Sequence, residues 1–190
     1  MIADLNDIPE SWRAALACIQ EVLPSAVMAG GCLRDRDNGR AVKDIDIFAH
    51  GYGESDLWDA HAALKAHGLA LEDIDMEKMY PVDGAELIGV IDVRQGPWPL
   101  ALPVQIIMTT WDTDKIVQRF DYGICRIAFD GQKITRSDDY LLDKHNKVFR
   151  LVRERTAEQL EASVMRYARL SPKYEGWPFK AYISEIDFIV

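Results

Sequence analysis

The chain has 190 residues and a formal net charge of −9, from 22 basic and 31 acidic residues. This length and a hydrophobic fraction of 48% are typical of a single folded domain with its own core, and they argue against a disordered chain. The negative charge repels phosphate backbones at long range. It therefore argues against broad, nonspecific binding to DNA or other nucleic acids.

Helical spacing of apolar residues predicts a first helix that begins near Pro9 and ends at Pro24. The order of the elements that follow is mixed, which predicts an α+β or α/β domain built around one mixed sheet. Asp130-Gly131 is a hairpin-turn signal. The other expected elements, in chain order, are a strand at 26–29, a short helix at 32–38, a strand at 43–49, a helix at 54–67, strands at 86–94 and 103–109, a helix at 112–119, a strand at 124–129 and a helix at 156–170.

The cysteines and the N-terminal segment indicate the cellular compartment of the protein. Cys18, Cys32 and Cys125 form no CxxC pair, and their odd number favours reduced thiols in a cytosolic protein. The first residues lack the apolar region of a signal peptide, and no apolar run approaches the ~20 residues that a membrane helix needs. We therefore expect a cytoplasmic protein with no membrane partner.

The most informative segment lies between residues 27 and 49. Successive side chains of a strand point to opposite faces, so Asp44 and Asp46 share one face while Ile45 and Ile47 enter the core. Two neighbouring carboxylates repel each other and need a compensating cation, for which Mg²⁺ or Mn²⁺ bound together with substrate phosphates is the natural candidate. A pair of such ions about 4 Å apart can stabilise both the entering and the leaving oxygen of a phosphoryl transfer.

A glycine turn precedes this strand. Gly30 and Gly31 let the backbone approach a ligand closely, and the helix expected after them offers free N–H groups to phosphate oxygens. Arg34 and Lys43 are candidates to hold a triphosphate, Arg34 through its planar guanidinium. Asp35 would be poorly placed beside a phosphate, so we expect it to orient a neighbouring Arg or Lys.

Each of these signals has a simpler alternative. A lone Gly-Gly is usually an ordinary turn, and a lone Asp-x-Asp is usually a solvated strand edge, but their succession within one short segment favours a nucleotide site. A basic run has two interpretations: a solvated helix face, which we favour, or a contact surface for a phosphate-bearing acceptor. The run consists of Lys144, Lys147, Arg150, Arg153 and Arg155.

These motifs resemble those of the polymerase-beta-like nucleotidyltransferase superfamily, and most of all the heads of class II CCA-adding enzymes and bacterial poly(A) polymerases. A second segment, 119–126, is similar to the Arg-Arg-Asp-aromatic-Thr-Ile-Asn-Ala motif of those heads. Compact heads of this kind also occur as free-standing proteins in bacteria and bacteriophages. The first resemblance rests on Gly30, Gly31, Leu33, Arg34, Asp35, Gly39, Asp44 and Asp46.

The resemblance implies an α+β nucleotidyltransferase head at 1–150, with a mixed sheet and flanking helices, and a short helical C-terminal extension at 151–190 packed on it. It implies Mg²⁺-dependent transfer of a nucleoside monophosphate from an NTP to an RNA 3′ end, a protein or a small molecule. Asp44 and Asp46 would be the catalytic and metal-binding residues, and Asp121 would lie near the ribose of the bound nucleotide. The alternative for Asp121 is a cap on the turn before a strand.

The sequence also departs from the family pattern. Phe120 replaces an Arg and Cys125 replaces an Asn, while Gln105 stands where many relatives place a further carboxylate. Asp92 is a candidate substitute for that carboxylate, or else a solvent-facing strand residue. The family's Glu/Asp-x-x-Arg element for base selection is not evident. These departures leave two further hypotheses open: a weak or inactive relative that works by binding a nucleotide or a protein partner, and a structural domain with no nucleotide site.

Overall fold

The computed structural model describes residues 7–53, 55–74, 87–99, 101–153 and 156–181. Its strands build a seven-stranded mixed sheet in the order β3-β4-β5-β2-β1-β6-β7, and a separate pair, β8-β9. The strands are β1 (Val27–Ala29), β2 (Ile45–His50), β3 (Ala70–Leu71), β4 (Leu87–Gln95), β5 (Val104–Thr109), β6 (Ile127–Phe129), β7 (Ile134–Arg136), β8 (Phe149–Leu151) and β9 (Phe179–Ala181). The helices are α1 (Glu10–Gln20), α2 (Gly31–Asp37), α3 (Asp56–Ala66), α4 (Thr113–Arg119), α5 (Asp138–Asn146) and α6 (Ala157–Leu170).

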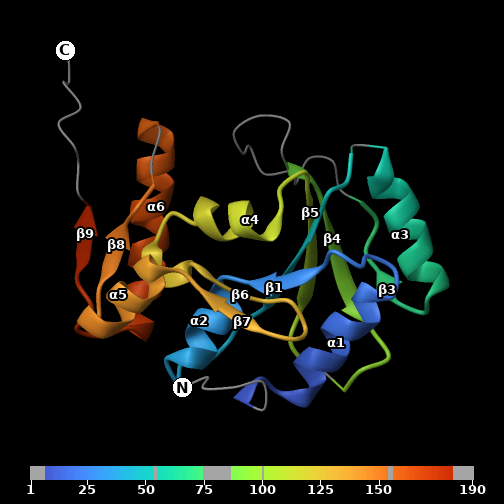
Figure 1. Cartoon of the computed structure of the whole chain (residues 1–190), viewed down its shortest axis with the longest axis horizontal. Helices are drawn as coiled ribbons and strands as arrows, with labels where there is room; N and C mark the ends of the chain where they lie inside the picture. The colour runs from blue at the N-terminus through green and yellow to red at the C-terminus, as the bar shows by residue number, and fades with distance from the viewer. Residues whose placement is uncertain (1–6, 54, 75–86, 100, 154–155, 182–190) are drawn as a thin grey trace.

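The central strands fix which residues can share a site. β2 pairs with β5 in parallel and with β1 in antiparallel orientation, and β4 pairs with β5 in antiparallel orientation. The short strand β1 therefore leads directly into α2 beside the start of β2 (Figure 1). This arrangement brings the glycine turn and the Asp-x-Asp strand together.

The two faces of the sheet bury different apolar clusters. Ile45, Ile47 and Ile106 belong to the main core, together with buried side chains of α1 and α3. Phe48 of β2 belongs to the second, smaller cluster with Ile116 and Val117 of α4 and buried residues of β1 and β6. Because side chains alternate along a strand, even-numbered residues of β2 face the α4 side of the sheet.

Local sequence explains where several elements begin. Asp112 and Ser137 stand one residue before α4 and α5, and their side chains accept hydrogen bonds from the backbone N–H groups of Lys115 and Tyr140. The Asp130 carboxylate accepts from two backbone N–H groups in the turn between β6 and β7, as expected for the predicted hairpin. The order of elements confirms an α+β fold with a mixed sheet.

The C-terminal part of the described chain differs from a purely helical extension. Residues 151–181 contain α6 and a 3₁₀ turn at Ser171–Lys173, but also β9, which pairs in parallel with β8. An aromatic cluster around Phe149 packs this segment together, with ring centroids 5.1 to 5.9 Å from that of Phe149. The members of the cluster are Tyr122, Phe149, Tyr167, Tyr174 and Trp177.

The contacts of the basic run at 144–155 match neither of the two interpretations predicted for it. The ammonium group of Lys144 pairs with the buried Asp37, and the guanidinium group of Arg150 pairs with Asp139 and Asp143. Arg153 donates to a backbone carbonyl of α4. These cations hold α5 and β8 to the head instead of forming one solvated or phosphate-binding face, and residue 155 lies outside the described residues.

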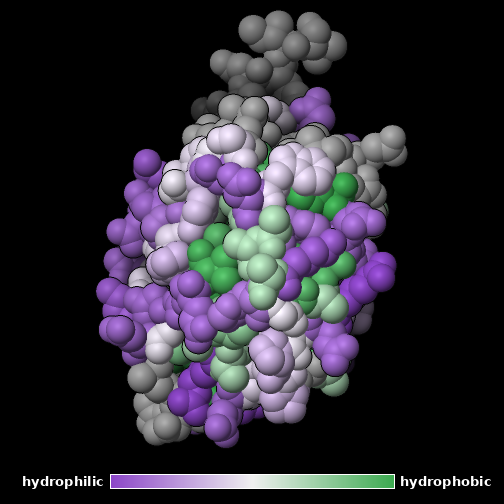
Figure 2. Space-filling view, turned by 90° about the vertical axis from the view of Figure 1, so that its right-hand side faces the viewer, coloured by the Kyte–Doolittle hydropathy of each residue, from purple (hydrophilic) through white to green (hydrophobic). Residues whose placement is uncertain are grey.

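The surface of the molecule on the α3 side is mostly polar. Figure 2 shows hydrophilic side chains over this face, with hydrophobic surface confined to separate small patches. Within the described residues, no helix is long and apolar enough to span a membrane.

Candidate active site

The two aspartates of the Asp-x-Asp motif lie at the start of β2. Asp44 and Asp46 are both partly exposed, while Ile45 between them is fully buried. Burial, followed by the charge of Asp44, raises the pKa of Asp46 to about 6, and the cations of Arg34, Lys43 and Arg166 act in the opposite direction. Two interacting carboxylates of which one is largely desolvated make a site that a divalent cation would stabilise.

The glycine turn approaches this pair through α2. Gly30 has a positive φ of 78° and immediately precedes α2. The Cys32 side chain in the first turn of α2 contacts the backbone of Asp46, and the charge of Asp46 adds to burial in raising the pKa of the Cys32 thiol. The first N–H groups of a helix have no acceptor within it, so they are available to a ligand beside Asp46.

The two glycines have different structural requirements. A Cβ on Gly30 would lie 2.8 Å from the ring of Phe120, and the positive φ disfavours every other residue there. A Cβ on Gly31 would meet only the Arg34 side chain, at an ordinary 3.8 Å. Phe120 in turn packs edge-to-face on Phe48, with ring centroids 5.8 Å apart.

We therefore predict that Gly30→Ala lowers the free energy of unfolding by about 1–3 kcal/mol, because it adds a ring clash to the cost of a left-handed backbone. Gly31→Ala places alanine in a helix and is expected to stay within about 0.5 kcal/mol of the parent protein. Urea unfolding of both variants measures the difference. Equal stability of the two variants would show that Phe120 and the turn rearrange freely.

Arg34 lies inside the wall of the site, with a side chain only 6% exposed. Its Nε donates to Asp35 at 2.7 Å and its Nη1 to the Cys125 Sγ at 3.1 Å. Asp35 also accepts from Tyr174 Oη at 2.7 Å and from Lys173 Nζ at 2.6 Å. Burial alone would raise the pKa of Asp35, but Arg34, Lys173 and Tyr174 together outweigh it and hold that pKa below its ordinary value.

This network agrees with the expected role of Asp35 and adds a constraint on Arg34. Asp35 orients an Arg and a Lys, as its position after the glycine turn predicted. Two of the three guanidinium nitrogens of Arg34 are already used inside the protein. Lys43, by contrast, has a side chain 86% exposed and lies 3.7 Å from Asp44, so it can reach a phosphate beside the aspartate pair.

The carboxylate of Asp121 accepts three hydrogen bonds from described residues. Its Oδ1 accepts from the Tyr122 N–H at 3.0 Å, and its Oδ2 accepts from Ser163 Oγ at 2.8 Å and from Arg166 Nη1. Ser163 and Arg166 belong to α6, and Tyr122 Oη donates to the Ser163 carbonyl at 2.6 Å. Asp121 thus fixes α6 against the head and holds Arg166 near the aspartate pair. A contact between Asp121 and a ribose remains a prediction.

Arg166, Lys173 and Tyr174 were not predicted as site residues. Arg166 stands on a regular amphipathic helix, and its proximity to Asp121 depends on how α6 folds back on the head. Lys173 and Tyr174 lie in a turn more than a hundred residues after Asp35. No local pattern in the sequence specified the partners of these three residues.

A polar row continues from Asp46 across the sheet. Asp46 lies opposite Gln105 in the parallel β2-β5 ladder, and Gln105 lies opposite Asp92 in the β4-β5 ladder. Gln105 Nε2 donates to Asp92 Oδ1 at 2.7 Å. Among the described residues, no group of three or more His, Cys, Asp or Glu side chains is placed to hold a metal ion, which is consistent with Gln105 separating the two ends of the row.

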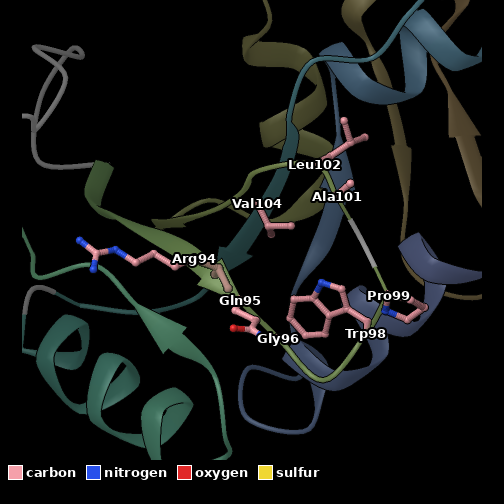
Figure 3. Close-up of a pocket in the computed structure, with 9 residues that line it drawn as sticks. Arg94, Gln95, Gly96, Trp98, Pro99, Ala101, Leu102 and Val104 are labelled. Carbon is pink, nitrogen blue, oxygen red and sulfur yellow. The ribbon is translucent and has the colours of Figure 1, made fainter.

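A separate cleft of about 480 Å³ lies at the turn between β4 and β5. Figure 3 shows the Trp98 ring inside it and the Arg94 side chain extending away from it. Val93 and Val104 line the cleft from the core face of the sheet, whereas Asp92 and Gln105 face the other side. The cleft is therefore distinct from the polar row.

Comparison with solved structures gives one consistent result. A tRNA-processing enzyme in its apo form matches with a TM-score of 0.65 and 16% identity, over 91% of this chain and 45% of that one. The Bacillus stearothermophilus CCA-adding enzyme in complex with CTP matches with a TM-score of 0.63 and 17% identity, over 91% and 42%. The Thermotoga maritima CCA-adding enzyme in complex with tRNA matches with a TM-score of 0.62 and 14% identity, over 95% and 41%.

The chain shares its fold with part of these tRNA-processing and CCA-adding enzymes. It spans less than half the length of these three structures. Neither the models of protein families nor the curated proteins give a match to the sequence. At this level of identity the likeness shows the fold alone and leaves the function of the chain to be argued from the site.

Proposed function

We propose that this nucleotidyltransferase fold transfers a nucleoside monophosphate from an NTP to the 3′ end of an RNA and releases pyrophosphate. The supporting observation is the Asp44-Asp46 pair next to the turn at Gly30-Gly31, in which partial burial and the charge of Asp44 raise the pKa of Asp46 to about 6. The solved structures of the same fold include complexes with CTP and with tRNA. A divalent cation bound together with the triphosphate would supply the positive charge that offsets the two carboxylates.

In this proposal each residue of the site has a defined role. Asp44 and Asp46 would hold Mg²⁺ or Mn²⁺, and that cation would supply charge stabilisation to the phosphates of the NTP. The backbone at Gly31 and the ammonium group of Lys43 bind phosphate oxygens. Arg166, held by Asp121, adds a second cation from α6. Positioning and charge account for this chemistry, and no covalent enzyme intermediate is needed.

Nucleotide transfer is tested by incubating the purified protein with labelled NTPs, Mg²⁺ and total RNA. We expect Asp44→Asn and Asp46→Asn each to lower the rate of label incorporation by about 10²–10³-fold, because each removes a charge that the cation site requires. Asp59→Asn, which makes the same substitution on the exposed face of α3, is the matched control and is expected to retain the parent rate. Incorporation that persists in both site variants would contradict the proposal.

The same experiment identifies the acceptor. Label in RNA that is removed by ribonuclease supports the proposal. Label in protein or in a small molecule would show that the acceptor is not RNA and would contradict this part of the proposal. Gly31→Ala adds a further check, because its methyl group would stand where the backbone approaches the triphosphate. We expect a higher KM for the NTP with unchanged stability in this variant.

A second candidate function is nucleotide binding without turnover. It is favoured by the neutral Gln105 in the polar row and by the engagement of Arg34 inside the protein. Calorimetry that detects NTP binding, together with no release of pyrophosphate under any acceptor condition, would select this candidate.

A further inference from the structure

The polar row of Asp46, Gln105 and Asp92 on the α4 face of the sheet indicates how the cation would be bound. This inference rests on the proposed function. Asp46, Gln105 and Asp92 occupy directly opposed positions on three adjacent strands. The flanking residues Ile45, Ile106 and Ile91 are buried on the opposite face. All three polar side chains therefore project from the same face of the sheet, with the amide in the middle.

The hydrogen bond between Gln105 and Asp92 determines which way the amide points. The carboxylate of Asp92 can only accept, so the group of Gln105 that lies 2.7 Å from it must be the NH₂ group. The carbonyl oxygen is on the other arm of the amide, away from Asp92. It is therefore the group that Gln105 presents toward the remaining member of the row, Asp46.

Gln105 separates Asp92 from the aspartate pair. Its side chain stands on the strand between Asp46 and Asp92. The Asp92 carboxylate accepts the hydrogen bond from the Gln105 amide, so it is engaged there and not beside Asp46. Asp92 can nevertheless act on the site through the amide that it orients.

We propose that Gln105 supplies a neutral carbonyl oxygen as the third protein ligand of the cation held by Asp44 and Asp46, and that Asp92 is the positioning residue that turns this oxygen toward it. Amide carbonyls bind hard divalent cations, but they contribute no charge. The site consequently carries two negative charges where three carboxylates would carry three. It binds one divalent cation weakly in the absence of a triphosphate.

An exchange of the two side chains tests this directly. The double variant Gln105→Glu plus Asp92→Asn keeps the net charge of the chain and restores the hydrogen bond with its donor and acceptor reversed. It moves the carboxylate one strand closer to Asp46. We expect the affinity for Mn²⁺ alone, measured by electron paramagnetic resonance on the full chain, to increase by about 10-fold.

Single variants distinguish whether Asp92 acts by orienting the Gln105 amide or by its own charge. Asp92→Asn retains an acceptor oxygen for Gln105 and is expected to keep the parent Mn²⁺ affinity within about 2-fold. Asp92→Ala releases the amide and is expected to weaken Mn²⁺ binding by about 10-fold, as is Gln105→Leu, which removes the oxygen. If Asp92→Asn weakened binding as much as Asp92→Ala, Asp92 would act by its charge and the positioning role would be wrong.

Two controls distinguish this inference from the proposed function. The variant with both Asp44→Asn and Asp46→Asn must lose Mn²⁺ binding; if it does not, or if the parent protein binds none, the cation site itself is wrong. If that variant loses binding while every change at positions 92 and 105 leaves the affinity unaltered, only the role of Gln105 is refuted. Circular dichroism melts verify that each variant is folded.

Discussion

Replacing Asp46 with asparagine is expected to stabilise the metal-free protein at pH 8 by about 1–3 kcal/mol, although it removes an active-site residue. The pKa of Asp46 is raised from 3.8 to about 6, first by burial and second by Asp44. At pH 8 the folded protein must therefore keep a carboxylate ionised in an unfavourable environment, which costs up to about 3 kcal/mol relative to the unfolded chain. Asparagine has nearly the same shape and removes the charge.

The sign of the pH dependence follows from the same shift. Between pH 4 and pH 6 the folded state binds more protons at Asp46 than the unfolded state does, so this residue lowers stability as the pH rises through that range. Urea unfolding in the presence of EDTA measures the effect. The difference between the parent protein and Asp46→Asn should be largest at pH 8 and should shrink toward pH 4.

A control and a cation titration complete this test. Asp59→Asn on the exposed face of α3 should leave stability unchanged at both pH values. Adding Mg²⁺ should stabilise the parent protein and not Asp46→Asn, because binding to the folded state alone shifts the equilibrium. A destabilised Asp46→Asn variant at pH 8 in EDTA would show that this carboxylate is satisfied by the protein without a cation.

The largest loss of stability is expected for Asp35→Ala, at about 3–5 kcal/mol. Asp35 accepts hydrogen bonds from Arg34, Lys173 and Tyr174, and its side chain is only 5% exposed. Its removal leaves the guanidinium of Arg34 buried without its carboxylate partner, which is the costly way to break a buried ion pair. Thermal and urea unfolding both report the change.

Two further variants show which contact matters. Tyr174→Phe removes one hydrogen bond to Asp35 and leaves the ion pair, so about 1 kcal/mol is expected. Glu175→Ala alters an exposed acidic residue in the same turn and should have an effect below about 0.5 kcal/mol. A loss below 1 kcal/mol for Asp35→Ala would mean that water replaces the carboxylate and that the network contributes little.

The central elements could be predicted from the sequence because their signals are local. Strand alternation at 44–47 separated the two aspartates from the two isoleucines, and the glycine turn marked the start of α2. Apolar spacing located α1 and α6, and Asp130-Gly131 marked the hairpin between β6 and β7. Each of these patterns lies within a few residues of the structure that it specifies.

The partners of the site residues could not be predicted, because they depend on strand order and on how α6 folds back. Gln105 is recognisable as a polar residue in an apolar strand, but its place between Asp46 and Asp92 requires the β4-β5-β2 order. The same applies to Asp121 and Arg166, which come from separate parts of the chain. Lys144 and Arg150 looked like surface cations because their acidic partners are set by tertiary packing.

The hydrogen bonds from Tyr174 to Asp35 and from Ser163 to Asp121 have a consequence for how the chain divides into units. Both acidic acceptors lie before residue 150, and both donors lie after it. A truncated protein that stopped at 150 would expose Phe149 and leave the two carboxylates without these donors. We therefore expect the smallest autonomously folding fragment to extend at least through β9.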